Sequence, residues 1–313
     1  MQAQFLSYAL HALRIRATHF STNGLVKSWT LRGSMHIFPE TDLPLYFRRC
    51  GQPEDVIHSD WYLWSQTHGG VNVPEREQHF AHLVTCAIAE GTDTRESLRT
   101  LCRDHGMTET EETRLFHSWG GLMAELAQSG VICSKVQDEK AYQLCPAFVP
   151  LDTHDAELEL ARRYFTHYAP ATLRDAAYFF HVSQAQIKRW LKELPVTSFT
   201  LEGREYFHIP TPTLQRDVPD CLLLAGFDPL LLGYRKEDNP FLPAEHLRKV
   251  FNLSGIVHPT ILLKGRIVGR WKQKDGRLSL CLFEEIGTRD KRHIIAYAER
   301  LWQLHRADFT SAD

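Results

Sequence analysis

Two stretches of the chain repeat one order of helical and strand-like patterns. In residues 74–150, apolar positions recur at helical spacing in Glu75–Glu90, Thr94–His105 and Glu109–Gln128. The next segments, Val131–Ser134 and Ala141–Cys145, alternate between apolar and polar residues as the strands of a hairpin do. Three helices followed by a hairpin predict a winged helix-turn-helix domain over residues 74–150.

The same order recurs in residues 151–212. The expected helices are Asp155–Tyr168, Thr172–Phe180 and Gln184–Leu194, and the expected strands are Val196–Leu201 and Glu205–Ile209. Ser183 is a suitable N-cap for the third helix. Lys188 falls on the polar face of that helix, opposite its apolar stripe, which makes it a candidate DNA contact.

The beginning of the chain has a different pattern. Phe5–Arg16 is predicted to be an apolar helix, and Leu25–Phe38 a hairpin that turns at Arg32 and Gly33. Pro39 then opens a short predicted helix, Glu40–Arg49.

The end of the chain, residues 213–313, is rich in strand patterns. Val257–Leu263, Arg266–Trp271 and Arg277–Phe283 are separated by short turns, and a helix is expected over Asp290–His305. We therefore expect an α+β protein in which tandem winged helix-turn-helix domains surround a small antiparallel β-sheet or barrel.

Composition narrows the class of protein. The 313 residues carry 36 Lys and Arg against 38 Asp and Glu, and 43% of them are hydrophobic, as in globular proteins with a buried core. The seven cysteines are scattered, which argues against a disulfide framework or a four-thiolate zinc site. No segment is long and apolar enough to span a membrane, so a cytoplasmic protein without a membrane partner is expected.

One local cluster of charge stands out from the neutral total. Residues 264–277 contain one acid and six basic residues: Lys264, Arg266, Arg270, Lys272, Lys274 and Arg277. Such a hairpin could bind the phosphate backbone of DNA. On its own, such a hairpin is more often a charged edge that protects the sheet against aggregation.

Other candidate residues have weaker local support. Asp228 follows an apolar strand, where it could be a functional carboxylate or could cap the turn at Pro229. His79 and His82 lie three residues apart on a predicted helix, but nothing nearby completes a metal site, so no metal or other cofactor is expected. The tripeptide Gln-Ala-Gln occurs at residues 2–4 and again at 184–186, so its surroundings must distinguish the two copies.

The surroundings of the first copy resemble a known family. Gln2-Ala3-Gln4 leads into an Ala/Leu-rich helix and is followed by Ser28–Ile37 (SWTLRGSMHI) and Phe227–Arg235 (FDPLLLGYR), and then by a hairpin over Pro259–Gly269. This order of motifs resembles the AlkZ-like DNA glycosylases over nearly the whole chain. The resemblance implies three tandem winged helices around a β-barrel, with residues 1–52 as the remnant of the first.

The resemblance also implies a site. Two polar residues that flank an apolar one carry catalysis in that family, and they correspond here to Gln2 and Gln4, which places the chain in the Gln-x-Gln branch. Family members carry about thirty residues before this motif, so the chain is expected to start inside the first winged helix and to be impaired in this form. Arg32, His36 and Arg235 lie in the matching motifs and are further candidates for DNA binding, together with Asp228, Lys188 and the basic hairpin.

The residue types of this pair restrict the chemistry. Glutamine does not titrate, so it cannot protonate a leaving group. A purine alkylated at N7 is already cationic and can leave without protonation. The sequence therefore predicts a monofunctional glycosylase for N7-alkylated purines, including bulky or crosslinked ones, that acts on double-stranded DNA as a monomer. The alternative hypothesis is a non-enzymatic winged-helix regulator.

Overall fold

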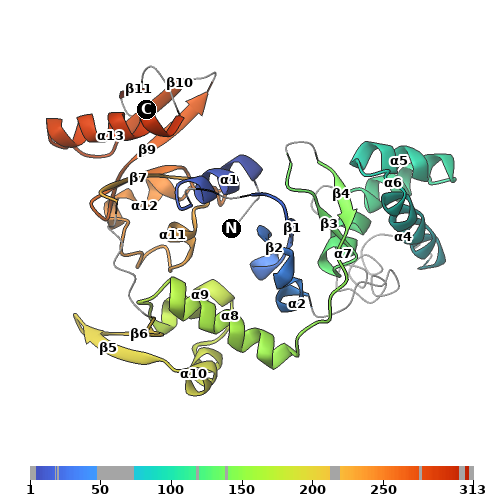
Figure 1. The fold of residues 1–313 in the computed structure, drawn as a ribbon, viewed down its shortest axis with the longest axis horizontal. Coiled ribbons are helices and arrows are strands. Elements are labelled where there is room, and N and C mark those ends of the chain that lie inside the picture. The colour runs from blue at the N-terminus through green and yellow to red at the C-terminus, as the bar shows by residue number, and fades with distance from the viewer. Residues whose placement is uncertain are drawn as a thin grey trace. The chain divides into compact units, whose positions relative to one another are not determined.

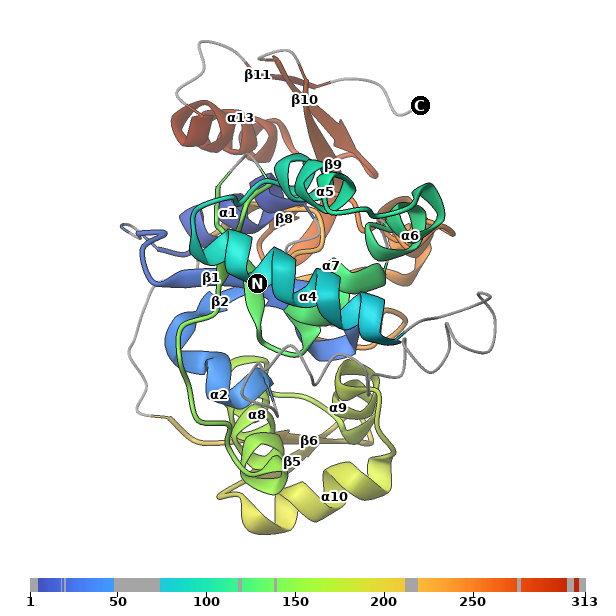
Figure 2. The same ribbon diagram turned by 90° about the vertical axis from the view of Figure 1, so that its right-hand side faces the viewer.

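The computed structural model describes residues 5–17, 19, 21–47, 74–117, 120–137, 140–211, 219–274, 277–302 and 307–309. The chain forms two compact units. The first unit is Ser21–Leu160, and the second combines Met1–Phe20 with Ala161–Asp313. Figures 1 and 2 show their elements from two directions. Among the described residues, none of the helices combines the length and the apolar character needed to cross a membrane.

The first unit contains a four-stranded antiparallel sheet in the order β2-β1-β3-β4. Its strands are β1 (Leu25–Trp29), β2 (Met35–Pro39), β3 (Ile132–Ser134) and β4 (Tyr142–Leu144). Both predicted hairpins are present, but Lys27 of β1 pairs with Ser134 of β3, so they share one sheet. An isolated hairpin is marginally stable, and joining the two gives each a larger buried face.

The helices of this unit are α2 (Leu43–Tyr46), α4 (Pro74–Ala89), α5 (Arg95–Asp104), α6 (Glu109–Leu115) and α7 (Gly121–Gln128). Thr94, the first residue of the segment expected to be helical, caps α5 by accepting a bond from the Ser97 amide. The core between these helices contains Phe80, Val84, Leu98, Leu115 and Leu126, each at most 1% exposed.

Two predicted helices of this unit differ from the structure. The single helix expected over Glu109–Gln128 is divided into α6 and α7. Gly121 has φ +76°, and a Cβ there would lie 2.4 Å from the Arg114 carbonyl oxygen, so the chain turns sharply at this glycine. The helix expected to begin after Pro39 begins only at Leu43, because β2 extends to Pro39 and a 3₁₀ turn, Glu40–Asp42, follows it.

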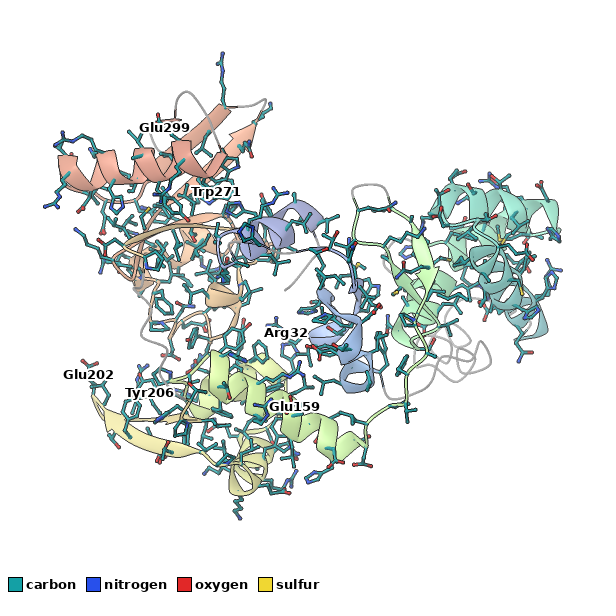
Figure 3. The ribbon with its side chains drawn as sticks, viewed as in Figure 1. Arg32, Glu159, Glu202, Tyr206, Trp271 and Glu299 are labelled. Atoms are coloured by element: carbon teal, nitrogen blue, oxygen red, sulfur yellow. The ribbon has the colours of Figure 1, made fainter. Side chains whose placement is uncertain are left out.

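The second unit contains the predicted helix–helix–helix–hairpin order within a few residues of the expected bounds. Its elements are α8 (Thr153–His167, which begins in the other unit), α9 (Leu173–Phe180), α10 (Gln184–Glu193), β5 (Thr197–Leu201) and β6 (Arg204–His208). Ser183 caps α10, and Ile187 and Trp190 form the buried side of that helix. The hairpin turns at Glu202, which Figure 3 shows at its tip.

The C-terminal part of this unit is a five-stranded sheet in the order β11-β10-β9-β8-β7. Its elements are β7 (Cys221–Leu224), α11 (Pro229–Leu232), α12 (Leu247–Val250), β8 (Thr260–Leu263), β9 (Arg266–Lys274), β10 (Arg277–Leu282), α13 (Thr288–Trp302) and β11 (Ala307–Phe309). The antiparallel prediction is correct except for β11, which pairs parallel to β10.

The expected barrel is not found in the described part of the chain. Closing a barrel requires the two outermost strands to pair, and β7 and β11 remain the borders of an open sheet. Helix α1 (Leu6–Arg14) packs against β7 in this unit, beside that border in Figure 1. The first predicted segment, residues 1–52, is thus divided, with its helix in one unit and its hairpin in the other.

Candidate functional site

Gln2 and Gln4 lie outside the described residues, but the helix that follows them is described in detail. Helix α1 begins at Leu6, directly after Phe5, and has three buried residues, Ala9, His11 and Ala12. The contacts of this helix therefore show what supports the chain next to the candidate catalytic pair.

His11 attaches the middle of α1 to the C-terminal sheet. Its Nε2 lies 2.7 Å from the Leu223 carbonyl oxygen of β7, and its ring packs at 5.0 Å from Trp271 and 5.1 Å from Trp302. Figure 3 shows Trp271 in the sheet beneath α13. Burial lowers the pKa of His11 below the ordinary histidine value, so the ring is neutral and donates its single Nε2 hydrogen to the carbonyl.

Asp228 and Arg16 attach the end of α1 to the same unit. Asp228 is fully buried, and its two carboxylate oxygens accept bonds of 2.5 and 3.0 Å from the Arg16 guanidinium. The Oδ1 of Asp228 also accepts a bond of 3.0 Å from the Leu230 amide and so caps α11. The predicted turn role of Asp228 is correct, and the ion pair with Arg16 is an addition that the local sequence does not indicate.

The residues just before Asp228 hold the beginning of α1. The Phe5 ring stacks on Phe227 at 5.9 Å. Gly226 lies so close to Tyr8 that an added Cβ would be 2.6 Å from the Tyr8 ring. The short segment Gly226–Asp228 therefore contacts the start of α1 and the residues after its end, and these contacts fix the direction of the helix.

Arg32 and His36 lie in the β1–β2 hairpin of the other unit. Arg32 has φ +62° in the turn, a left-handed conformation that is uncommon for a residue with a side chain. The Nδ1 of His36 lies 2.9 Å from both the Ser34 carbonyl oxygen and the Thr30 hydroxyl. A carbonyl only accepts, so Nδ1 carries the hydrogen and the Nε2 of the neutral ring is an acceptor.

Burial lowers the pKa of His36 to about 3, and the nearby positive charge of Arg32 acts in the same direction. His36 is therefore neutral at physiological pH and cannot act there as an acid. Thr30, whose hydroxyl contacts His36, also lines a cavity of about 220 Å³ together with residues of the same unit that include Trp29, Tyr46 and Glu157.

Arg235 is occupied by contacts inside its own unit. Its amide donates to Asp175 at 3.0 Å, and its guanidinium lies 3.2 Å from Glu237 and 3.3 Å from Asp238. Lys188, in contrast, is exposed on α10. The structure does not bring these two candidates into one cluster with Asp228.

The basic hairpin over residues 264–277 is partly neutralised by acids distant in sequence. Lys264 pairs with Asp290 at 2.8 Å, and Arg266 pairs with Glu245 and Glu284 at 3.3 and 3.2 Å. Arg270 packs over the Phe283 ring at 6.0 Å. Lys272 and Lys274 are exposed at the end of β9, so the available charge of the hairpin is concentrated there.

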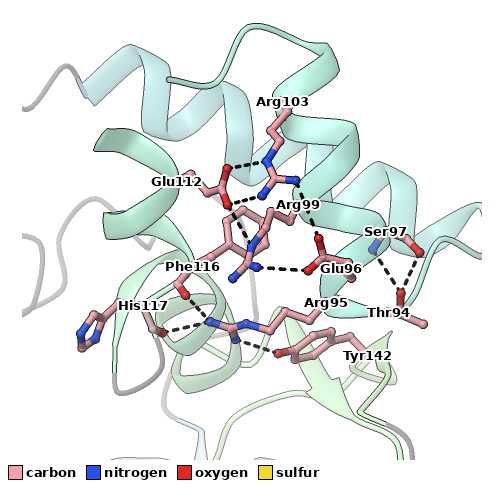
Figure 4. Close-up of polar contacts among 10 residues, drawn as sticks. All are labelled: Thr94, Arg95, Glu96, Ser97, Arg99, Arg103, Glu112, Phe116, His117 and Tyr142. Carbon is pink, nitrogen blue, oxygen red and sulfur yellow. Dashed lines mark hydrogen bonds and ion pairs between the residues drawn. The ribbon is translucent and has the colours of Figure 1, made fainter. Parts of the chain in front are cut away.

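Two arginines of helix α5 are likewise paired with acidic residues of their own unit. Figure 4 shows Arg99 and Arg103 bonded to Glu112 and Glu96, at distances between 2.5 and 3.7 Å, while Arg95 donates to the Phe116 and His117 carbonyl groups. These arginines join α5 to α6. In the described residues, no group of three or more His, Cys, Asp or Glu side chains could hold a metal ion.

Replacing Arg16 tests whether the ion pair fixes α1. Arg16→Met leaves the buried Asp228 carboxylate without its cation, and we expect a loss of about 3 kcal/mol in the free energy of unfolding. This is the low end for such a pair because the Arg16 side chain is 32% exposed. Arg14→Met, which removes an exposed arginine in the last turn of α1, is the control, and urea unfolding measures both. Equal stability of the two variants would contradict the role of the pair.

His36 makes stability depend on acid pH. Unfolded histidine binds a proton below a pH of about 6.5, whereas folded His36 does so only near its pKa of about 3. Stability is therefore lost as the pH falls through this window, by at most about 1.4 kcal/mol per pH unit. His36→Gln removes this titration. Between pH 6.5 and 4, the free energy of unfolding of the variant should therefore fall with pH less steeply than that of the wild type, by up to about 1.4 kcal/mol per pH unit, the contribution of one proton. Identical slopes for both proteins would show that His36 is not held neutral.

Comparison with known proteins places this chain in a family. The family model described as DNA glycosylase AlkZ-like matches residues 1–304. A curated relative, the "Interstrand DNA cross-link repair glycosylase" of Streptomyces sahachiroi, is 25% identical over 280 residues, which are 83% of this chain and 74% of the relative. The solved structure of Streptomyces sahachiroi DNA glycosylase AlkZ has a similar fold, with a TM-score of 0.73 at 22% identity over 100% of this chain and 91% of that one. Because the family model matches nearly the whole chain, the protein belongs to the AlkZ-like DNA glycosylases, enzymes that hydrolyse N-glycosidic bonds.

Proposed function

We propose that the protein is a monofunctional DNA glycosylase that releases N7-alkylated purines from double-stranded DNA, with Gln2 and Gln4 positioning the attacking water. The observation that carries this proposal is the anchoring of α1. The helix directly behind the glutamine pair is fixed by His11, by the Arg16–Asp228 ion pair and by aromatic contacts of Phe5. Orientation of a water molecule requires such a fixed support.

The proposed mechanism needs no titrating residue. An N7-alkylated purine carries a positive charge, and it leaves as a neutral base when the glycosidic bond breaks. The sugar then develops oxocarbenium character, and the water attacks it. The glutamine amides offer carbonyl acceptors for the hydrogens of that water and donors for its lone pairs. Placing the nucleophile in this way can lower a barrier by several kcal/mol, about 7–11 at best.

The relative from Streptomyces sahachiroi is named for interstrand DNA crosslinks. A crosslinked purine is a bulky alkylated base, and the same chemistry of a cationic leaving group applies to it. We therefore include crosslinked purines in the proposed substrate class. Membership of a glycosylase family favours an enzyme over the regulator hypothesis.

We also propose that the protein acts as a monomer and that the outer part of the basic hairpin contacts phosphates. Lys272 and Lys274 support this role because they are exposed, whereas Lys264 and Arg266 already have acidic partners. Lys188 is a second proposed phosphate contact, on the exposed face of α10.

The excision test uses the second Gln-x-Gln copy as a control. On duplex DNA that contains N7-methylguanine, we expect Gln4→Ala to lower the single-turnover excision rate about 100-fold or more, the effect typical of removing one positioned polar group. Gln186→Ala changes the identical tripeptide in α10 and should leave the rate unchanged. The product should be an abasic site without strand cleavage. Equal loss in the two variants, or borohydride trapping of a covalent adduct, would refute the mechanism.

Salt dependence separates the two parts of the hairpin. Each phosphate contact contributes about 0.9 to the slope of log affinity against log salt concentration. We expect Lys272→Ala to lower that slope by about one contact, and Lys264→Ala, which removes a residue already paired with Asp290, to leave it unchanged. Fluorescence anisotropy with duplex DNA between 50 and 200 mM salt, the range over which such contacts are compared, measures both. If Lys264→Ala lowers the slope as much as Lys272→Ala does, Lys264 leaves Asp290 to contact DNA, and the proposed division of the hairpin is wrong.

A further inference from the structure

The turn between α12 and β8 exposes a leucine. Leu253 is 88% exposed, the highest value among the large hydrophobic side chains of the described residues, and Val149 follows with 82%. A single exposed apolar residue is ordinary in a protein surface. Three further features of this turn make Leu253 unusual.

The first feature is rigidity. Phe251 and Val257 pair as an isolated antiparallel bridge at the base of the turn. Asn252 closes the turn twice, because its amide donates to the Ile256 carbonyl at 3.0 Å and its side-chain oxygen accepts from the Ile256 amide at 2.8 Å. Gly255 supplies the left-handed conformation, with φ +80°. Leu253 is thus held at the tip of a closed turn.

The second feature is a direct connection to the support of α1. The Phe227 amide donates to the Val257 carbonyl at 3.2 Å, and a Cβ on Gly226 would lie 3.0 Å from that same oxygen. Gly226–Asp228 is the segment that also contacts Phe5, Tyr8 and Arg16. The base of the Leu253 turn and the helix behind the glutamine pair are therefore held by the same three residues.

The third feature is the charge around the turn. Lys249 and Arg270 both pack over the Phe283 ring, at 5.1 and 6.0 Å. Arg248 is exposed on α12, next to Lys249. The nearby acids Glu245 and Glu284 are paired with Arg266. Cations thus lie at the foot of the turn that carries the apolar tip.

We propose that Leu253 is a wedge that enters the base stack of duplex DNA, while Lys249 and Arg270 bind the flanking phosphates. An enzyme that acts on a base must take it out of the stack, and an apolar side chain can fill the space it leaves. Proteins that bend DNA use leucine and similar side chains between base steps together with basic residues on the backbone. The proposed function supplies the identity of the partner, and the rigid turn supplies the position of the wedge.

The wedge can be tested without any excision. The DNA is a duplex that carries a tetrahydrofuran abasic analogue, which has no base to release, with 2-aminopurine as the adjacent base. The fluorescence of 2-aminopurine rises when it loses its stacking neighbour. Saturating wild-type protein should raise the fluorescence, and Leu253→Ala should lose most of that rise. Leu253→Met, which keeps an apolar side chain of similar length, should retain it.

Binding gives a second readout. Burying the exposed leucine in the gap corresponds to about tenfold in affinity for abasic over intact duplex, and Leu253→Ala should lose that preference. Val149→Ala is the matched control, because Val149 is nearly as exposed and lies in a different unit, in the connection before α8. It should preserve both the fluorescence rise and the preference.

The outcomes separate this inference from the proposed function. If N7-methylguanine is not excised but Leu253→Ala abolishes the fluorescence rise, the wedge stands and the proposed chemistry fails. If excision occurs and Leu253→Ala gives the same rise as the wild type, the wedge is overturned and the chemistry stands. A wild-type protein that binds the duplex without any rise also overturns the wedge.

Discussion

The ion pair between Arg16 and the buried Asp228 is the interaction on which the position of α1 depends. A carboxylate with no exposed surface is strongly destabilising unless its charge is balanced and its oxygens are bonded. Arg16 supplies both requirements with two bonds from one planar group, which a lysine cannot reproduce. Since Leu230 uses the same carboxylate, the helix α11, the turn before it and the end of α1 are fixed relative to one another by one side chain.

The proposed role of Gln2 and Gln4 depends on a fixed support of this kind. Carboxylates can compensate for imperfect placement with charge and proton transfer, whereas glutamine acts only through the direction of its hydrogen bonds. The helix α1 is held at its start by Phe5 and Tyr8, in its middle by His11 and at its end by Arg16, and this is the support that the proposed mechanism requires. A neutral His11 suits this role, because its burial against two tryptophans disfavours the charged form.

The cations of this protein are used in two ways. Arg95, Arg99 and Arg103 join α5 to α6, and Lys264 and Arg266 tie the C-terminal sheet to neighbouring acids. Lys188, Lys272 and Lys274 are exposed. The local excess of positive charge in residues 264–277 therefore overstates what that hairpin offers to a phosphate backbone, because its acidic partners come from Glu245, Glu284 and Asp290.

The sequence by itself determined the local elements. Each local signal involves only a few neighbouring residues. Such signals are the caps Ser183 and Thr94, the apolar stripe of α10 and the turn residues of the hairpins, and the structure contains the elements that they predict. An ordered set of motifs in the sequence also predicted the family, but only that resemblance distinguished Gln2 and Gln4 from the identical tripeptide in α10. Tertiary structure decided the rest. The pairing of β1 with β3 and the open sheet with a parallel β11 depend on contacts between segments that are far apart in sequence. Arg16 and Asp228 are 212 residues apart, and neither has a neighbour in sequence that indicates the other, because the pair forms only when folding brings the two segments together and buries the carboxylate.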